Sequence, residues 1–189
     1  MSIDMMLPLE AFDPTRVVME YSKYSNYIQT NIQRFIYSLS YKEDFFTLSP
    51  ISILTPFAKI HTWDFTTGKL ELDIGNHSLF QTQFHSLQTS VRSLVDQRYT
   101  LKPYFHPMLF GTLLTVYVYT KADTFKERET WCCHNNQWTN ILKETTFRKG
   151  DSIRLGIQFQ GVSFLQDNSK RELKYRLQHQ VKVIYKQLM

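Results

Sequence analysis

The chain has 189 residues, of which 42% are hydrophobic and 21% are charged, and its formal net charge is +5 at pH 7. This composition is ordinary for a globular protein and does not indicate disorder, while the positive charge favours polyanionic partners. Glycine is scarce and no glycine-rich phosphate-binding motif occurs, which argues against a nucleotide-binding loop. No apolar run approaches the roughly 20 residues of a membrane span, so we expect no membrane partner.

Cysteine usage and the first residues bear on the cellular compartment. The only cysteines, Cys132 and Cys133, are adjacent in the sequence, and adjacent cysteines do not readily form a structural disulfide. The first residues, MSIDMMLPLEAFDP, contain acidic side chains and lack the basic start of a signal peptide. We therefore expect an intracellular protein in a reducing compartment.

The first element that the sequence predicts is a helix over residues 14–34. Asp13 and Pro14 are the residue types preferred at the N-cap and at the first helical position. Apolar residues then recur at three- and four-residue spacing: Val17, Tyr21, Tyr24, Ile28, Ile32 and Phe35. The continuation is open, because Phe35, Tyr37, Leu39 and Tyr41 alternate as strand residues do. We expect an N-terminal helical arm over residues 1–40, followed by one domain over residues 41–189.

Strand patterns follow, and a second helix interrupts them. Residues 59–74 alternate between apolar and polar side chains around a turn that contains Gly68, which predicts a β-hairpin. Residues 78–96 then carry apolar side chains three and four positions apart. This spacing predicts an amphipathic helix, with Ser78 and Gln81 as its capping box.

Further strands are expected after this helix. Residues 112–121 alternate, and so do residues 152–165 and 171–185, which a polar turn separates. An antiparallel hairpin of the last two would pair residues 158 and 178 near its middle. The order of elements is typical of an OB fold. We therefore predict a mainly β (α+β) fold, an OB-like small β-barrel with a helix inserted midway and an N-terminal helix.

The last two predicted strands each have an apolar face and a cationic, amide-rich face. A solvated sheet face usually mixes acids with bases, yet no carboxylate interrupts the polar positions from Arg154 to Gln160 or from Lys174 to Lys182. Lys and Arg neutralise phosphates, and Gln binds phosphate, sugar or base edges. The candidate nucleic-acid-binding residues on these strands are Arg154, Gln158, Lys174, Arg176, Gln178 and Lys182. The alternative is a solvated face with no partner.

Aromatic side chains at positions expected to be exposed would complete a platform for single strands. Bases stack on such rings with about 1–3 kcal/mol each and with little dependence on sequence. The candidates are Trp63 and Phe65 in the first hairpin, Tyr117 and Tyr119 beside Lys121, and Tyr104 and Phe105 in the proline-bounded loop. The alternative is that many of these rings belong to the core.

Metal binding and catalysis have little support in the sequence. Cys132, Cys133 and His134 are consecutive, whereas zinc sites use spaced pairs of ligands. No nucleophile elbow, zinc-protease motif or acidic cluster suited to two-metal chemistry occurs. His179 lies on the apolar face of the last strand, where we expect it to be half-buried with its hydrogen bonds satisfied. We expect no metal, no cofactor and no enzymatic activity.

The last quarter of the chain combines a basic Lys-Gly turn, an apolar strand, a Gly-x-x-Phe step and a strand that ends in Gln-Val. The positions concerned are Lys149, Gly150, Gly161, Phe164, Lys174, Tyr175, Gln180 and Val181. This block resembles the C-terminal block of the single-stranded-DNA-binding proteins of large nucleocytoplasmic DNA viruses, which are distant relatives of phage-type OB-fold binders. Position 163 is Ser where that family tends to carry Trp, the second strand lacks the family's glycine, and no acidic tail follows.

The cationic face, the aromatic residues and the resemblance together predict a non-enzymatic single-stranded nucleic-acid-binding protein. Single-stranded DNA is favoured, although no feature reports on the 2′-hydroxyl of RNA. Replication, repair or end protection in a nuclear or viral replication compartment is the expected role. The alternative is a structural or interaction subunit of a capsid or larger assembly. The N-terminal helix would offer a further site for a protein partner.

Overall fold

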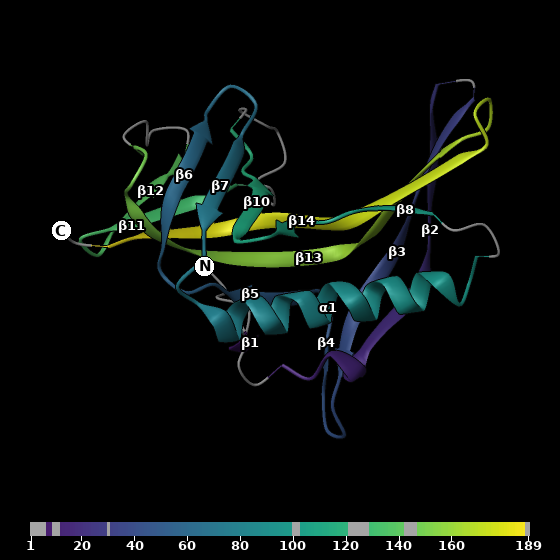
Figure 1. The fold of residues 1–189 in the computed structure, drawn as a ribbon, viewed down its shortest axis with the longest axis horizontal. Helices are drawn as coiled ribbons and strands as arrows, with labels where there is room; N and C mark the ends of the chain where they lie inside the picture. The colour runs from purple at the N-terminus through teal and green to yellow at the C-terminus, as the bar shows by residue number, and fades with distance from the viewer. Residues whose placement is uncertain are drawn as a thin grey trace.

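The computed structural model describes residues 7–8, 12–29, 31–99, 103–120, 129–141 and 147–187, with the backbone alone for 7–8 and 21–29. Within these residues the fold is mainly β, with fourteen strands in one sheet and one α-helix (Figure 1). The elements are β1 (Leu7–Pro8), η2 (Pro14–Arg16), β2 (Val17–Gln29), β3 (Ile32–Lys42), β4 (Thr47–Leu48), β5 (Ile51–Leu54), β6 (Ala58–Asp64), β7 (Lys69–Asp73), α1 (Ser78–Asp96), β8 (Tyr104–His106), β9 (Leu109–Phe110), β10 (Leu113–Tyr117), β11 (Trp131–His134), β12 (Gln137–Asn140), β13 (Ser152–Asp167) and β14 (Glu172–Lys186).

The long hairpin of β13 and β14 forms the centre of the sheet and runs along the molecule (Figure 1). On its other edge β13 pairs with β6, β5 and β3 in succession. The other edge of β14 pairs in parallel with β8 and with β11. The two long strands predicted from alternation are therefore confirmed. The predicted hairpin around Gly68 is also confirmed, as β6 and β7.

Two β-bulges interrupt the β13–β14 hairpin, one after Gly156 and one before Gly161. Each bulge inserts an extra residue, and this changes which side chains share a face on the two strands. Gln158 lies opposite Gln180 rather than Gln178, so the predicted pairing of residues 158 and 178 is wrong. The main reason is the position of the turn, because Asp167 already pairs with Glu172 and the turn is therefore centred between Ser169 and Lys170. In β13 the unpaired Gln160 changes the buried apolar positions from Ile157 and Phe159 to Val162 and Phe164, so simple alternation does not hold along the whole strand.

The predicted N-terminal helix is wrong. Asp13 does cap a helical turn, because its carboxylate accepts a hydrogen bond from the Thr15 N–H at 2.9 Å, but this turn is only the three-residue η2. The chain then enters β2, which pairs with β3, and β3 pairs with β13. Alternate β3 residues, including Phe35, Leu39 and Tyr41, are buried in the core. Residues 162–167 of β13 offer backbone groups that β3 can pair with, and aromatic residues are frequent in strands. Both factors favour strands here over a helix that starts at Asp13.

This correction changes the expected organisation of the first residues. The boundary proposed at residue 40 falls inside β3, whose residues pair with β2, β4 and β13. Because residues 17–29 and 32–42 are strands, the protein partner expected for an N-terminal helix has no such helix to bind.

The second predicted helix is confirmed as α1, but its predicted capping box is not. His77, rather than Ser78, occupies the N-cap, and its side chain makes no capping bond to the helix. The Nε2 atom of His77 lies 2.7 Å from the carbonyl oxygen of Phe57. The Gln81 side chain donates to the carbonyl oxygen of Ile74 at 2.9 Å and so ties the start of the helix to the end of β7.

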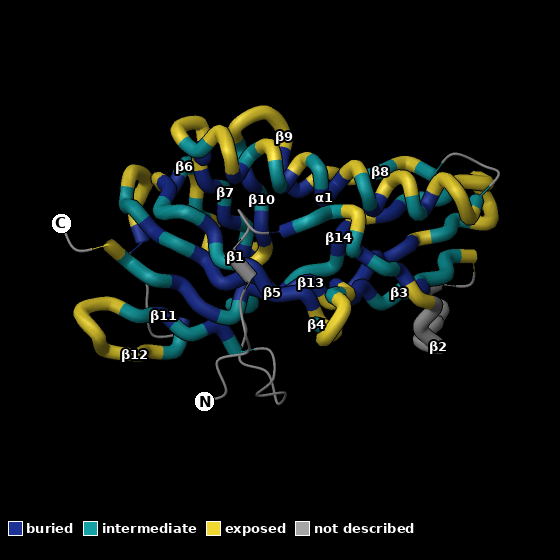
Figure 2. The backbone as a smooth tube through the Cα atoms, turned by 90° about the horizontal axis from the view of Figure 1, so that it is seen from below, coloured by how far each residue is buried: buried dark blue, intermediate teal, exposed yellow. Residues whose placement is uncertain are grey.

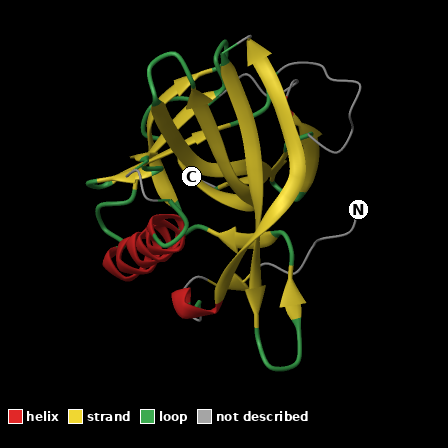
Figure 3. Cartoon of the chain, turned by 90° about the vertical axis from the view of Figure 1, so that its right-hand side faces the viewer, coloured by secondary structure: helices red, strands yellow, loops and turns green. Residues whose placement is uncertain are grey.

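The helix covers one face of the curled sheet and closes the core (Figures 2 and 3). Phe84 of α1 is fully buried, and its ring centroid lies 6.1 Å from that of Phe159 in β13. Farther along, Phe164 stacks between Phe35 at 5.0 Å and Tyr175 at 5.4 Å. This aromatic packing covers the apolar face of β14 and leaves its opposite, polar face outside the core.

The sheet curls towards a barrel but does not close. Through β6 and β7 it leads to β10, which lies beside β14 without a backbone ladder between the described residues of the two strands. β8 and β11 occupy the outer edge of β14 at Lys174–Arg176 and at Val183–Tyr185. The segment between these pairings faces β10, so the expected closed barrel is replaced by an open gap.

Candidate nucleic-acid interface

Three adjoining hollows of about 530, 260 and 670 Å³ follow β14 between β3, β8 and β10. The first shares Arg34 with the second, and the second shares His106 and Arg176 with the third. We call them together the β14 groove, defined by the polar and aromatic residues Arg34, Lys69, His106, Tyr117, Tyr119, Gln160, Lys174, Arg176, Gln178, His179 and Gln180. Strands far apart in the sequence thus contribute to one surface.

The β14 groove carries an excess of positive charge. None of the described residues that line it is Asp or Glu. Its lysines have carboxylate neighbours, since Lys69 pairs with Glu71 at 2.7 Å and Lys174 pairs with Glu172 at 3.0 Å. Neither groove arginine forms an ion pair with a described carboxylate. The guanidinium groups therefore supply the unneutralised charge.

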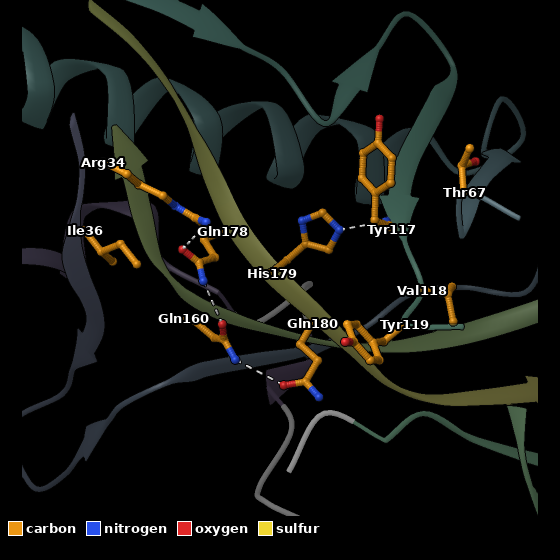
Figure 4. A pocket seen from close by; sticks show the side chains of 10 residues that line it. All are labelled: Arg34, Ile36, Thr67, Tyr117, Val118, Tyr119, Gln160, Gln178, His179 and Gln180. Carbon is orange, nitrogen blue, oxygen red and sulfur yellow. Dashed lines mark hydrogen bonds between the residues drawn. The ribbon is translucent and has the colours of Figure 1, made fainter. Parts of the chain in front are cut away.

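A chain of amide side chains orients the first of these arginines (Figure 4). Arg34 donates from Nε to Ser163 Oγ at 3.1 Å and from Nη2 to Gln178 Oε1 at 3.3 Å. Gln178 donates in turn to Gln160, and Gln160 donates to Gln180, each at 3.1 Å. Every amide in this chain has its orientation fixed by a neighbour. The arrangement holds the Arg34 guanidinium with neutral partners only.

His179 bridges the gap between β10 and β14. The backbone N–H of Tyr117 donates to its Nε2 atom at 2.9 Å, so the neutral ring carries its proton on Nδ1. Nδ1 is buried and has no hydrogen-bond partner of normal geometry among the described residues, contrary to the expectation of a satisfied ring. Burial lowers the pKa of His179 to about 4; the Leu177 backbone opposes this shift, and the charge of Arg176 adds to it.

Five predicted binding residues line the β14 groove: Tyr117, Tyr119, Lys174, Arg176 and Gln178. Their common position follows from the approach of β10 to β14 across the open gap. Lys121, predicted beside the two tyrosines, lies outside the described residues. The structure thus brings together one part of the predicted set.

Arg154 and Gln158 line none of the three hollows. Arg154 donates from Nε to the carbonyl oxygen of Thr55 at 2.8 Å, and its guanidinium lies over the Phe57 ring at 5.0 Å. Gln158 is 7% exposed and pairs within the sheet on both sides. Neither residue therefore belongs to the groove lining, although Gln158 lies opposite the groove residue Gln180 in the β13–β14 pairing.

The remaining predicted residues also lie outside the β14 groove. Trp63 and Phe65 form an aromatic cluster on the β6–β7 hairpin, where the Trp63 ring lies 6.1 Å from Phe65 and 6.0 Å from Phe147. Lys182 is half-buried and lines none of the three hollows. Trp63, Phe65 and Lys182 therefore do not contribute to the β14 groove.

Several groove residues carry little signal in the sequence. Arg34 falls within the predicted helix, although its neighbours Phe35, Tyr37, Leu39 and Tyr41 alternate as strand residues do. His106 stands between two prolines and has no periodic pattern around it. The contribution of these residues depends on strand pairings across long sequence separations, which no local pattern contains.

Comparisons with protein-family models, with curated proteins and with solved structures find no match. The resemblance of the last quarter of the chain therefore stays a prediction. Among the described residues, no helix combines the length and the apolar character that a membrane crossing requires. The same residues contain no group of three or more His, Cys, Asp or Glu side chains arranged to hold a metal ion.

Proposed function

We propose that the protein binds single-stranded DNA along the β14 groove, without catalysis, in replication, repair or end protection. The observation that supports this proposal is the lining of the groove by cations, amides and tyrosines with no described carboxylate among them. The proposed place of action, an intracellular nuclear or viral replication compartment, rests on the resemblance of the C-terminal block.

Each class of side chain has a role in this mechanism. Arg34 and Arg176 neutralise phosphates and release counterions, which provides affinity that is independent of sequence. Tyr117 is 49% exposed and offers its ring to an unstacked base. The glutamine amides bind phosphate, sugar or base edges beside it. The bound strand is thereby shielded from nucleases and from re-pairing.

Equilibrium binding to a fluorescently labelled oligothymidylate, measured by anisotropy over a series of salt concentrations, tests the proposal. We expect affinity to fall linearly on a log–log plot, with a slope near −0.7 for each phosphate contacted. A duplex of the same length should bind more weakly, and an oligouridylate measures the preference for DNA over RNA. Flat salt dependence, or equal affinity for duplex and single strand, would overturn the proposal.

A second candidate function is that of a structural or interaction subunit. Phe45 and Phe46, in the turn between β3 and β4, are 98% and 42% exposed, and exposed neighbouring rings favour a protein partner. If the subunit assembles with itself, the mass in solution should be a multiple of the chain mass and should fall when both residues are replaced by Ser. A monomer in both cases would remove this support.

A further inference from the structure

The smallest hollow of the β14 groove lies where β3, β13, β14 and β8 run side by side. Cross-strand pairing sets two adjacent rows on one face of the sheet. The first row contains Arg34, Leu165, Lys174 and Tyr104, and the second contains Ile36, Ser163, Arg176 and His106. This packing of cationic side chains around a hollow of about 260 Å³ is the most compact concentration of positive charge in the groove.

Two donor groups in this hollow are fixed and only partly used. Arg34 spends two of its five N–H donors on Ser163 and Gln178. Ser163 is only 7% exposed, and its Oγ accepts the bond from Arg34, but no described group accepts its hydroxyl hydrogen. An anion seated in the hollow would accept from both side chains.

The charge of the hollow matches a dianion better than a monoanion. Arg34 and Arg176 have no described carboxylate partner, and Lys174 shares its charge with Glu172 at 3.0 Å. A phosphodiester in the middle of a strand carries one negative charge and two free oxygens. A phosphate monoester carries about 1.5 to 2 charges at pH 7 and three acceptor oxygens. The monoester therefore balances the two free guanidinium groups and occupies more of the donors.

A stacking surface stands beside the hollow. Tyr104, the β8 neighbour of Lys174, is 61% exposed, and its ring centroid lies 4.7 Å from that of His106 in an edge-to-face arrangement. The base of a nucleotide whose phosphate fills the hollow could stack on this ring. We propose that the hollow binds the terminal phosphate monoester of a single strand, a specificity that rests on the proposed function.

The test compares affinities for one oligothymidylate that carries a 5′-phosphate, a 3′-phosphate or neither. We expect one phosphorylated end to bind about tenfold more tightly than the unphosphorylated strand, the effect of a hydrogen bond to a charged group. The two phosphorylated strands distinguish the two possible sources of the monoester. Equal affinity of all three strands would overturn the terminal subsite while leaving the proposed function standing.

Variants locate the effect. Gln178→Glu would place a carboxylate on Arg34 and should bring the ratio of unphosphorylated to phosphorylated Kd close to one. Ser163→Ala removes the unused hydroxyl without changing charge and should lower the same ratio. Thr89→Glu, on the exposed side of α1, adds the same negative charge elsewhere and should leave the ratio unchanged. A full ratio in both groove variants would contradict the assigned site.

Mononucleotides separate the two proposals. Thymidine 5′-monophosphate and 3′-monophosphate are titrated into the protein and compared with thymidine by NMR shift perturbation. Saturable shifts at Ser163 and Tyr104 with a monophosphate alone, without any strand binding, would support the subsite and overturn the proposed function. Strand binding with no difference between the monophosphates and thymidine would support the proposed function and overturn the subsite.

Discussion

The backbone N–H of Tyr117 donates to Nε2 of His179 at 2.9 Å, and this is the one hydrogen bond that joins described residues of β10 and β14. The described residues of these two strands form no backbone ladder, so an imidazole links them at this point. The bond requires a neutral ring, because a protonated imidazole has no acceptor.

This arrangement predicts that stability falls as the pH falls from about 6.5 to about 4. Burial lowers the pKa of His179 to about 4 in the folded protein, from 6.5 as an ordinary value. Below pH 6.5 the unfolded chain therefore binds a proton that the folded chain does not, and the free energy of unfolding decreases by about 2–3 kcal/mol across this window. Urea denaturation at a series of pH values measures the change.

His179→Gln provides the comparison, because Gln retains an acceptor for the Tyr117 N–H and does not titrate. Its stability should depend less on pH than that of the parent between pH 6.5 and 4. His85→Gln, an exposed position on α1, should behave as the parent does. An identical pH dependence in the parent and in His179→Gln would show that the ring is not held neutral.

Replacing Lys174 and Arg176 together with Ala should weaken binding to all single strands. The slope of the log–log salt plot should decrease in size by about 2, since each phosphate-contacting cation contributes about 1. Arg148→Ala with Lys149→Ala removes the same charge from the exposed turn before β13 and should leave the slope almost unchanged. If the two double variants have equal slopes, net charge rather than the groove determines binding.

Leu177 lies between Arg176 and Gln178 in the sequence, and its replacement should affect stability rather than binding. Leu177 is 1% exposed, so Leu177→Ala should lower the free energy of unfolding by about 2–5 kcal/mol. Leu165→Ala is the matched control, because Leu165 is 38% exposed and its truncation should cost well under half as much. Chemical denaturation of both variants gives the comparison, and equal losses would contradict the assignment of the two faces.

The stacking role of Tyr117 can be tested by comparison with an exposed ring outside the β14 groove. Tyr117→Leu keeps the backbone donor to His179 and should reduce the binding free energy of a single strand by about 1–3 kcal/mol. Phe65→Leu alters a ring of similar exposure, 37% against 49%, that lies outside the β14 groove, so its binding should match the parent's. Anisotropy titrations at one salt concentration are sufficient. Equal effects of both changes would exclude a specific role for Tyr117.

The parts of the fold that the sequence predicts correctly are those in which local pattern and tertiary environment agree. Residues 78–96 and the last two strands bury the faces that their periodicity indicates. The Asp13-Pro14 start is also real, yet the pairing of β3 with β13 prevails over it. The helix-like spacing over residues 17–35 therefore predicts the wrong element. It contains no information about β13, the strand near the end of the chain with which β3 pairs.

The candidate site shows the same limit more strongly. Arg34 and Ser163 are hydrogen-bonded across 129 positions of sequence. The turn at residues 168–171 sets the register that places Ser163 opposite Arg176, and Gly161 follows in the same register. Glycine fits at 161 because a Cβ would lie 2.1 Å from the carbonyl oxygen of Tyr37. Alternation predicted Lys174, Arg176 and their amide neighbours but could not identify their partners from β3 and β8.

Gly68 links the geometry of the first hairpin to the groove. Its φ is +72°, and a Cβ would lie 2.1 Å from the carbonyl oxygen of Val118, next to Tyr117. The Val118 N–H also donates to the Gly68 carbonyl oxygen at 2.8 Å. Gly68→Ala must therefore either adopt a strained backbone or move the end of β10. We expect a loss of at least about 3 kcal/mol in stability.

Gly111 offers a matched control, because its φ is +59° but nothing lies within 4 Å of the position of a Cβ. Gly111→Ala should cost only the left-handed backbone penalty, about 1–2 kcal/mol. Because Gly68→Ala would displace β10, it should also weaken single-strand binding at temperatures where the variant is folded, whereas Gly111→Ala should not. If the two alanine variants lose the same stability and bind equally well, the contact of Gly68 with Val118 does not position the tyrosine side of the groove.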